Sequence, residues 1–166
     1  MNRAMLFHAS IPARDPAKVA AVLADIWQGE AMPFPPVPGA HVVFAGDGRA
    51  TTLEIYPHDR TLVPSDAGVA IGTAAPVAGA VGDHVAIASP RSVTEIEAIA
   101  GKAGWRVQLA TRGGIFDVVE LWLEDRYLVE VLTPDMQAAY IDRVTPGNWR
   151  AMLSAPLLAP GGVLPG

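Results

Sequence analysis

The sequence predicts an α+β fold made of two tandem βαβββ modules that form one structural domain. The chain has 166 residues, the size of one domain, and 51% of them are apolar, which is enough apolar surface to offset the entropy lost on folding. Strand and helix patterns follow the same order in the two halves. A histidine and a glutamate also recur at one interval, because His8 precedes Glu54 and His84 precedes Glu130 by 46 residues each.

The first module is predicted to cover residues 1–59. Alternating residues from 4 to 11 predict its first strand. Asp15 followed by Pro16 is typical of a helix start, and Gly29 is expected to end that helix. Apolar residues recur between them at the spacing of one helix face: Val19, Val22, Leu23, Ile26 and Trp27.

Three more strands complete the first module. The proline-rich segment 31–39 permits only a short or edge strand. Residues 41–45 and 51–56 are predicted as two strands joined by the Gly-Asp-Gly turn at 46–48.

The second module, residues 83–135, repeats this order. A strand is predicted near His84, and Ser92 with Glu95 forms a capping-box pattern at the start of the next helix, which Gly104 ends. Three further strands are predicted at residues 105–110, 117–123 and 127–132. A single ferredoxin-like domain with an irregular tail is the alternative fold, and it predicts no equivalence between the halves.

Two segments lie outside the modules. Residues 60–82 are rich in Ala, Gly, Pro and Val and are predicted to form a linker with some extended structure. Residues 136–166 form a C-terminal extension whose apolar residues suggest packing on the domain or on a partner subunit.

Charge and composition exclude several classes of protein. The net charge is −5 and no basic stripe is visible, which argues against nucleic-acid binding. The chain has no cysteine, so thiolate metal sites, disulfides and cysteine nucleophiles are excluded. No uncharged stretch reaches the length of a membrane span, and no signal-peptide pattern opens the chain. We therefore expect a cytoplasmic protein that binds no membrane and no nucleic acid.

The repeated histidines and glutamates lie where strand alternation turns them away from the large apolar residues. A carboxylate in an apolar strand is costly to bury without a partner. Two imidazoles and two carboxylates would satisfy one divalent cation with nitrogen and oxygen donors. The set His8, Glu54, His84 and Glu130 therefore predicts a metal site. The alternative is that both glutamates lie on a solvated sheet face and both histidines are ordinary strand residues.

These residues carry a family resemblance. Paired βαβββ modules, each with His on its first strand and Glu on its last, resemble the vicinal oxygen chelate superfamily over roughly residues 4–135. This superfamily includes glyoxalase I, extradiol dioxygenases, epimerases and bleomycin-type resistance proteins. The resemblance implies that the two modules curve into a barrel-like cleft around one metal ion, which would be Ni, Zn, Mn or Fe. It implies that His8, Glu54, His84 and Glu130 are the ligands.

The resemblance also implies a function. The full His/Glu/His/Glu set is most similar to the glyoxalase I and epimerase branches, which implies a lyase or isomerase acting on a small substrate with vicinal oxygens. Glu54 or Glu130 would then be the base that takes a proton next to a metal-polarised carbonyl. No basic cluster suited to the carboxylates of glutathione is visible. The site would form within one chain or between swapped modules of a homodimer, because the family uses both arrangements.

Two other functions stay open. Ligation by His8, His84 and Glu130 alone would be the 2-His-1-carboxylate arrangement of an Fe(II) extradiol-type dioxygenase. A non-catalytic protein of the bleomycin resistance type would instead hold a small molecule in a cleft, which Phe44, Tyr56 and Trp122 could line.

Two smaller features remain ambiguous in the sequence. The turn at 112–114 either presents the Arg112 cation to an anionic substrate or is an ordinary loop. Glu120 and Trp122 share a strand face that points into the cleft or out to solvent.

Overall fold

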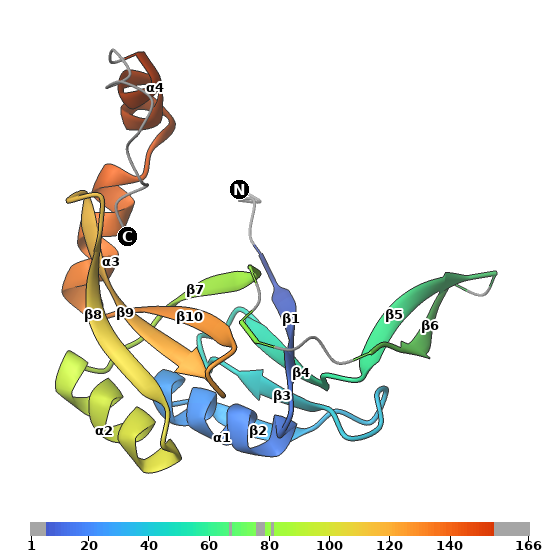
Figure 1. Ribbon diagram of the computed structural model, residues 1–166. Helices are drawn as coiled ribbons and strands as arrows, with labels where there is room; N and C mark the ends of the chain where they lie inside the picture. The colour runs from blue at the N-terminus through green and yellow to red at the C-terminus, as the bar shows by residue number, and fades with distance from the viewer. Residues whose placement is uncertain (1–5, 67, 76–78, 81, 155–166) are drawn as a thin grey trace.

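Two four-stranded sheets of mixed strand orientation form the body of the molecule in the computed structural model (Figure 1). The structure describes residues 6–66, 68–75, 79–80 and 82–154. The first sheet has the strand order β1-β4-β3-β2, and the second has the equivalent order β7-β10-β9-β8. In each sheet the first and last strands of a βαβββ unit are parallel neighbours, as two tandem repeats require.

The first sheet and its helix form where the sequence predicts them. The elements are β1 (His8–Ala13), α1 (Pro16–Trp27), β2 (Glu30–Pro33), β3 (His41–Phe44) and β4 (Thr52–Pro57). The side chain of Asp15 accepts a hydrogen bond from the backbone of Lys18 and so caps α1. The helix ends at Gln28, in the left-handed conformation, one residue before the expected Gly29. β2 is a four-residue edge strand, as its proline content predicts. Residues 4–5 of the predicted first strand lie outside the described residues.

The second sheet follows the same plan. Its elements are β7 (His84–Ala88), α2 (Val93–Ala103), β8 (Arg106–Arg112), β9 (Phe116–Leu123) and β10 (Tyr127–Leu132). The predicted capping box is confirmed, since Ser92 and Glu95 bond each other's backbone. Gly104 ends α2 with a φ of 75°, the left-handed conformation that glycine adopts most easily.

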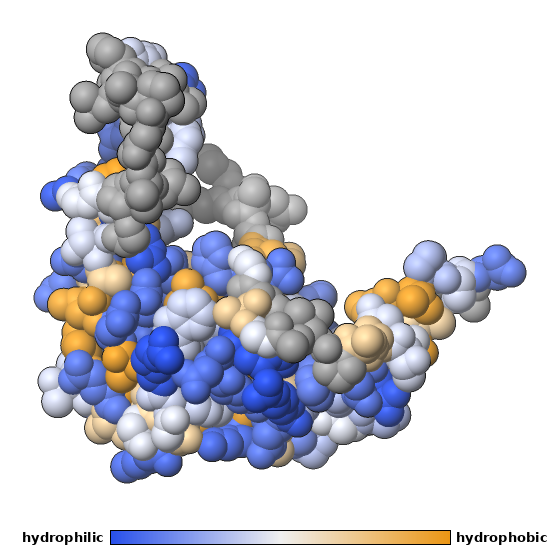
Figure 2. Space-filling view, in the orientation of Figure 1, coloured by the Kyte–Doolittle hydropathy of each residue, from blue (hydrophilic) through white to orange (hydrophobic). Residues whose placement is uncertain are grey.

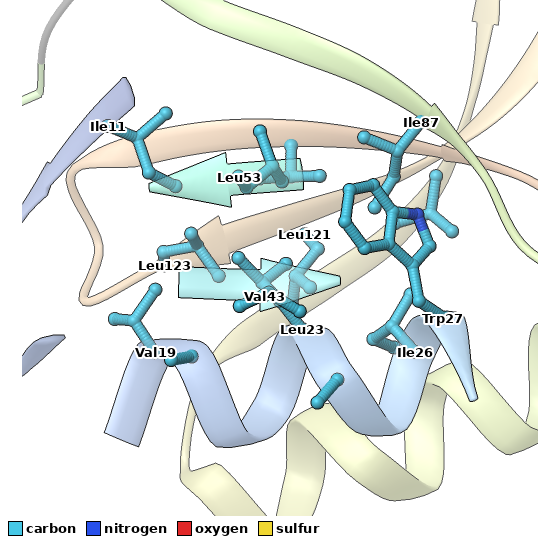
Figure 3. Packing of buried hydrophobic residues seen from close by; sticks show 14 of the residues in the cluster. Ile11, Val19, Leu23, Ile26, Trp27, Val43, Leu53, Ile87, Leu121 and Leu123 are labelled. Carbon is cyan, nitrogen blue, oxygen red and sulfur yellow. The ribbon is translucent and has the colours of Figure 1, made fainter. Parts of the chain in front are cut away.

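Both sheets pack their inner faces onto one shared core, and α1 contacts α2. Figure 3 shows Val43 and Leu53 of the first sheet beside Leu121 and Leu123 of the second, with the apolar face of α1 against them. The inner face of each sheet lies on this shared core, where α1 packs against the first sheet and α2 against β8 of the second. The outer faces, which carry the predicted site residues, point away from the core.

Polar contacts join the two modules around this core. The Glu124 carboxylate, in the turn between β9 and β10, accepts hydrogen bonds from the backbone N–H groups of Arg14 and Asp15 at 2.7 and 2.8 Å, just before α1. The buried Ser89 hydroxyl donates to the carbonyl of Ile26 at 2.6 Å. These bonds cross from one module to the other, so they hold the two modules in this relative position.

Two further parts extend from the body. The hairpin of β5 (Arg60–Ser65) and β6 (Gly68–Thr73) lies within the predicted linker and projects outward (Figure 1). Figure 2 shows apolar surface on this hairpin, where Leu62, Val63, Val69 and Ile71 are exposed. Beyond β10 the chain forms α3 (Pro134–Arg143) and α4 (Pro146–Ser154). Residues 155–166 of the predicted extension lie outside the described residues.

None of the helices in the described part of the chain is both long and apolar enough to span a bilayer.

Candidate metal centre

The first half of the candidate centre lies on the outer face of β1 and β4. The two strands are parallel, with His8 opposite Thr52 and Ser10 opposite Glu54. His8 and Glu54 are therefore diagonal neighbours on one face, while Leu53 and Ile55 point into the core. Alternation predicted this placement correctly.

The second half repeats this geometry on β7 and β10. His84 lies opposite Leu128, and Glu130 lies opposite Ala86. The histidine again precedes by two positions the residue that faces the glutamate. The equal sequence intervals thus correspond to equal strand registers, which confirms that the two halves are structural equivalents.

Hydroxyl groups hold the Glu54 carboxylate. Ser10 Oγ and Tyr56 Oη donate to the same oxygen, Oε2, at 3.1 and 2.8 Å. Within the described part of the chain no hydrogen bond reaches the other oxygen, Oε1. Burial, and then the hydrogen bond and charge of Glu54, raise the pKa of Tyr56, which keeps this phenol a proton donor at neutral pH.

An arginine holds the Glu130 carboxylate. Arg112 at the end of β8 donates from Nε and Nη2 to Glu130 Oε1 at 2.7 and 2.6 Å. Its Nη2 also lies 2.8 Å from Glu120 Oε1. Burial acts to lower the pKa of Arg112, but the hydrogen bonds and charges of the two glutamates outweigh it and raise that pKa. Among the described residues Glu130 Oε2 has no hydrogen-bond partner, so here too one carboxylate oxygen is open.

Two further side chains complete the surroundings of Glu120. Gln108 Nε2 and Trp122 Nε1 donate to Glu120 Oε2 at 2.9 and 3.4 Å. Glu120 and Trp122, whose orientation the sequence left open, therefore lie on the outer face beside Glu130. The turn that was singled out at Arg112 contributes an ion pair to the candidate centre.

Both candidate histidines are exposed on their sheet faces. His84 Nδ1 lies 3.4 Å from the carbonyl oxygen of Gly82. With Nδ1–H donating to that carbonyl, Nε2 carries the lone pair that a metal requires. The other two histidines, His41 and His58, are partly buried, and their Nδ1 atoms are buried without a hydrogen-bond partner in the described structure.

The donor types fit a divalent cation, but one chain does not bring them together. Within the described residues no three His, Asp or Glu side chains converge as a metal would require. His8 with Glu54 and His84 with Glu130 lie on two different sheets. Each chain therefore carries two candidate half-sites, and each pairs one histidine with one glutamate on the outer face of its sheet.

The predicted cleft residues lie on the same outer faces. Tyr56 and Phe44 lie on the first sheet, and Trp122 lies on the second. A cavity of about 590 Å³ runs along the seam between the β1 and β7 edges and is lined mainly by apolar residues such as Phe7, Trp27 and Ile87. Of the four predicted ligands it contains His8 alone, so this cavity is separate from the carboxylates.

No family model matches the chain. A search of curated proteins finds no relative in sequence. Solved structures do match its fold. FosX from Listeria monocytogenes, a fosfomycin resistance protein complexed with Mn(II) and sulfate, has a TM-score of 0.54 at 13% identity, covering 86% of this chain and 98% of its own.

Two further structures agree with this match. A FosX variant from Listeria monocytogenes, complexed with Mn(II) and 1S,2S-dihydroxypropylphosphonic acid, has a TM-score of 0.52 at 15% identity, covering 78% of this chain and 90% of its own. The trypanothione-dependent glyoxalase I of Leishmania major has a TM-score of 0.50 at 15% identity, covering 92% of this chain and 100% of its own.

These matches span nearly the whole length of each neighbour, and they share the mixed α+β architecture described above. The strand order is equivalent in the two modules, and in each the first and last strands pair in parallel. The structural neighbours match this fold over most of the chain. The chain has the vicinal oxygen chelate fold.

Proposed function

We propose that this chain is a metal-dependent enzyme of the glyoxalase type, a lyase or isomerase that acts on a small substrate with vicinal oxygens. The observation that carries the proposal is the repeated half-site, in which His8 with Glu54 and His84 with Glu130 occupy the same diagonal of equivalent parallel strands. In both half-sites, within the described residues, all hydrogen bonds to the carboxylate reach one oxygen and leave the other open for a metal.

A second copy of the chain completes the centre in this proposal. The outer face of the first sheet in one copy would meet the outer face of the second sheet in the other. The exposed apolar residues of the β5–β6 hairpin add surface suited to association. We therefore propose a homodimer with two shared metal centres.

The chemistry follows from the donors. A bound divalent ion would polarise a carbonyl or stabilise an oxyanion next to the reacting carbon. One glutamate would then take the proton from that carbon through its open oxygen. Phe44, Tyr56 and Trp122 would contact the substrate around the centre. The Mn(II), sulfate and phosphonate complexes of FosX support a divalent ion and a small, oxygen-rich ligand.

A ligand-binding protein without metal is the second candidate. One observation favours it: Arg112 already balances the charge of Glu130, so this half-site has a counter-ion of its own. Such a protein would bind a small molecule on the outer faces without any metal.

Metal content distinguishes the two candidates. The protein is incubated with Ni, Zn, Mn or Fe(II), freed of loose ions, and analysed by plasma mass spectrometry. We expect about one divalent ion per chain, and its loss in His84→Ala and Glu130→Gln. Glu97→Gln, an exposed carboxylate on α2, is the matched control and keeps the metal.

Other results would point elsewhere. An absence of stoichiometric metal under every condition would overturn the enzyme proposal and favour the ligand-binding protein. Fe(II) held with unchanged affinity in Glu54→Ala would favour the three-ligand dioxygenase instead.

A further inference from the structure

The cavity along the seam between β1 and β7, here called the seam cavity, combines an apolar wall with a few polar groups. Its volume is about 590 Å³, within the range of about 300–1,000 Å³ that is usual for small-molecule sites. Apolar side chains such as Phe7 and Ile87 line most of it, and Trp27, Ser89 and Gln137 also contribute to the lining. A wall of this kind, with few polar groups, is typical of a ligand site.

Hydrogen bonds bring the three polar members of this lining together. Ser89 Oγ donates to the carbonyl of Ile26, the residue before Trp27 in α1, at 2.6 Å. Gln137 Nε2 in α3 donates to the carbonyls of Ser89 and Leu132, at 2.9 Å each. Ser89 is thus bonded both to the end of α1 and to α3, so Trp27, Ser89 and Gln137 form one polar end of the seam cavity.

The indole N–H of Trp27 is a free hydrogen-bond donor at this end. The residue is only 8% exposed, and Figure 3 shows its ring beside Ile87. No described residue accepts a hydrogen bond from Trp27 Nε1. The fully buried, unpartnered nitrogens of the described side chains are those of His41 and His58, so Nε1 reaches open space, and the cavity that Trp27 lines provides it. Because a buried indole N–H usually has a partner, an acceptor atom on a ligand would satisfy this group.

The lining offers no free fixed charge to a ligand. Both amide N–H groups of Gln137 already donate to backbone carbonyls. Asp47, the one carboxylate among the described lining residues, accepts from Thr51 Oγ1 at 2.6 Å and from the backbone N–H of Arg49 at 2.8 Å. Neither Lys nor Arg occurs among those lining residues. An ionic group on the ligand would lose hydration without gaining a counter-ion, so the cavity favours a neutral molecule.

We infer that the seam cavity binds a neutral, mostly apolar small molecule whose carbonyl oxygen accepts a hydrogen bond from Trp27 Nε1. The apolar wall supplies most of the affinity, because it removes the apolar surface of the molecule from water. The single N–H fixes the orientation of the carbonyl. This inference goes beyond the proposed function, and it requires neither a metal ion nor a second copy of the chain.

Binding of a neutral naphthyl ketone tests the inference. The probe is Prodan, 6-propionyl-2-dimethylaminonaphthalene, whose fluorescence moves to shorter wavelength when it leaves water for apolar surroundings. Prodan is titrated into metal-free protein in the presence of a chelator, so that the candidate metal centre takes no part. We expect saturable binding with one site per chain.

A variant that fills the cavity locates the bound probe. Ala88 lines the seam cavity from β7 and is exposed, so a larger side chain there occupies the cavity without entering the core. Ala88→Phe should abolish saturable Prodan binding. The matched control is Ala98→Phe, an exposed alanine of α2 outside the lining, which should bind like wild type.

A variant that removes the donor tests the hydrogen bond. Trp27→Phe should weaken Prodan binding by about 2–12-fold, the usual contribution of one hydrogen bond. It should also move the emission of bound Prodan further to shorter wavelength, since its carbonyl is no longer hydrogen-bonded. Trp105→Phe is the matched control, because Trp105 lies outside the lining, and it should change neither value.

A second probe separates the hydrogen bond from packing. In 6-propyl-2-dimethylaminonaphthalene a CH₂ group replaces the carbonyl, so this probe accepts nothing from Trp27. Loss of ring packing in Trp27→Phe weakens both probes, whereas loss of the N–H weakens Prodan alone. We therefore expect Trp27→Phe to lower the ratio of the two affinities. Circular dichroism and thermal unfolding check that each variant is folded at the assay temperature.

Three results would overturn the inference. An absence of saturable Prodan binding by wild type would show that the seam cavity does not take a ligand of this class. Equal binding by Ala88→Phe and wild type would place the probe on another apolar surface, such as the exposed β5–β6 hairpin. An unchanged affinity ratio and emission in Trp27→Phe would contradict the carbonyl contact. All three would leave the proposed function standing, because metal content tests it separately.

Discussion

Tyr127 is a single residue that makes stability depend on pH. It is 4% exposed at the start of β10. Burial, and secondarily the charge of Asp83, raises its pKa to about 12 from the usual value of about 10. Folding therefore favours the protonated phenol. Its contribution to stability is complete below about pH 10 and is lost as pH rises through about 12.

The Tyr127→Phe variant tests this dependence. We expect wild type to lose up to about 2 kcal/mol of unfolding free energy between pH 10 and 12 that Tyr127→Phe does not lose. Urea unfolding at a series of pH values measures the difference. Parallel pH curves for the two proteins would show that the phenol does not titrate with folding.

Strand alternation predicted the orientation of single residues well. Glu54 and Glu130 lie on the expected faces because successive side chains on a strand point to opposite sides. The ion pair of Glu130 could not be predicted, because Arg112 lies 18 residues away and its reach depends on the register of three strands. No local sequence pattern specifies the register of these strands.

Gly29 limits how α1 can join the first sheet. A Cβ atom at this position would lie 2.0 Å from the backbone oxygen of Phe44 in β3. Because the clash is with backbone, a rotamer change cannot relieve it. We expect Gly29→Ala to lower the unfolding free energy by about 2 kcal/mol or more.

Gly101 provides the matched control for this substitution. It lies within α2, where an added Cβ meets no heavy atom of the described residues within 4 Å. Gly101→Ala should raise stability by up to about 1 kcal/mol through helix propensity. Thermal unfolding compares both variants with wild type. Equal midpoints for Gly29→Ala and wild type would contradict the close packing of α1 on β3.

Capping residues and turns explain why most elements were predictable. Asp15, Ser92 and Gly104 set helix ends by local chemistry, and the structure uses all three. The β5–β6 hairpin was predicted only as extended linker, because its apolar residues do not alternate clearly with polar ones. Its strand pairing depends on contacts between residues that local propensity does not specify.

The whole molecule carries its two candidate histidine–glutamate pairs on separate sheets. The sequence indicated that four residues belong together, but it contains no information on which faces of the two sheets meet. In the structure the two pairs lie on the outer faces of separate sheets, whose inner faces bury one core. The central claim is therefore that two copies complete each metal centre.

Mixing two variants that each lack one histidine–glutamate pair tests this claim most directly. One variant carries His8→Ala with Glu54→Gln, and the other carries His84→Ala with Glu130→Gln. Neither should bind a divalent ion alone, because each removes one half of every centre. Unfolding them together and refolding them should restore about one quarter of the wild-type metal, since half of the random dimers are mixed and each of these has one intact centre.

The control is the same treatment of each variant by itself, with light scattering to measure the oligomeric state. A mixture that binds about one quarter of the wild-type metal, as a dimer, is the result we predict. A refolded dimeric mixture that binds no more than the separate variants would contradict a centre shared between two chains.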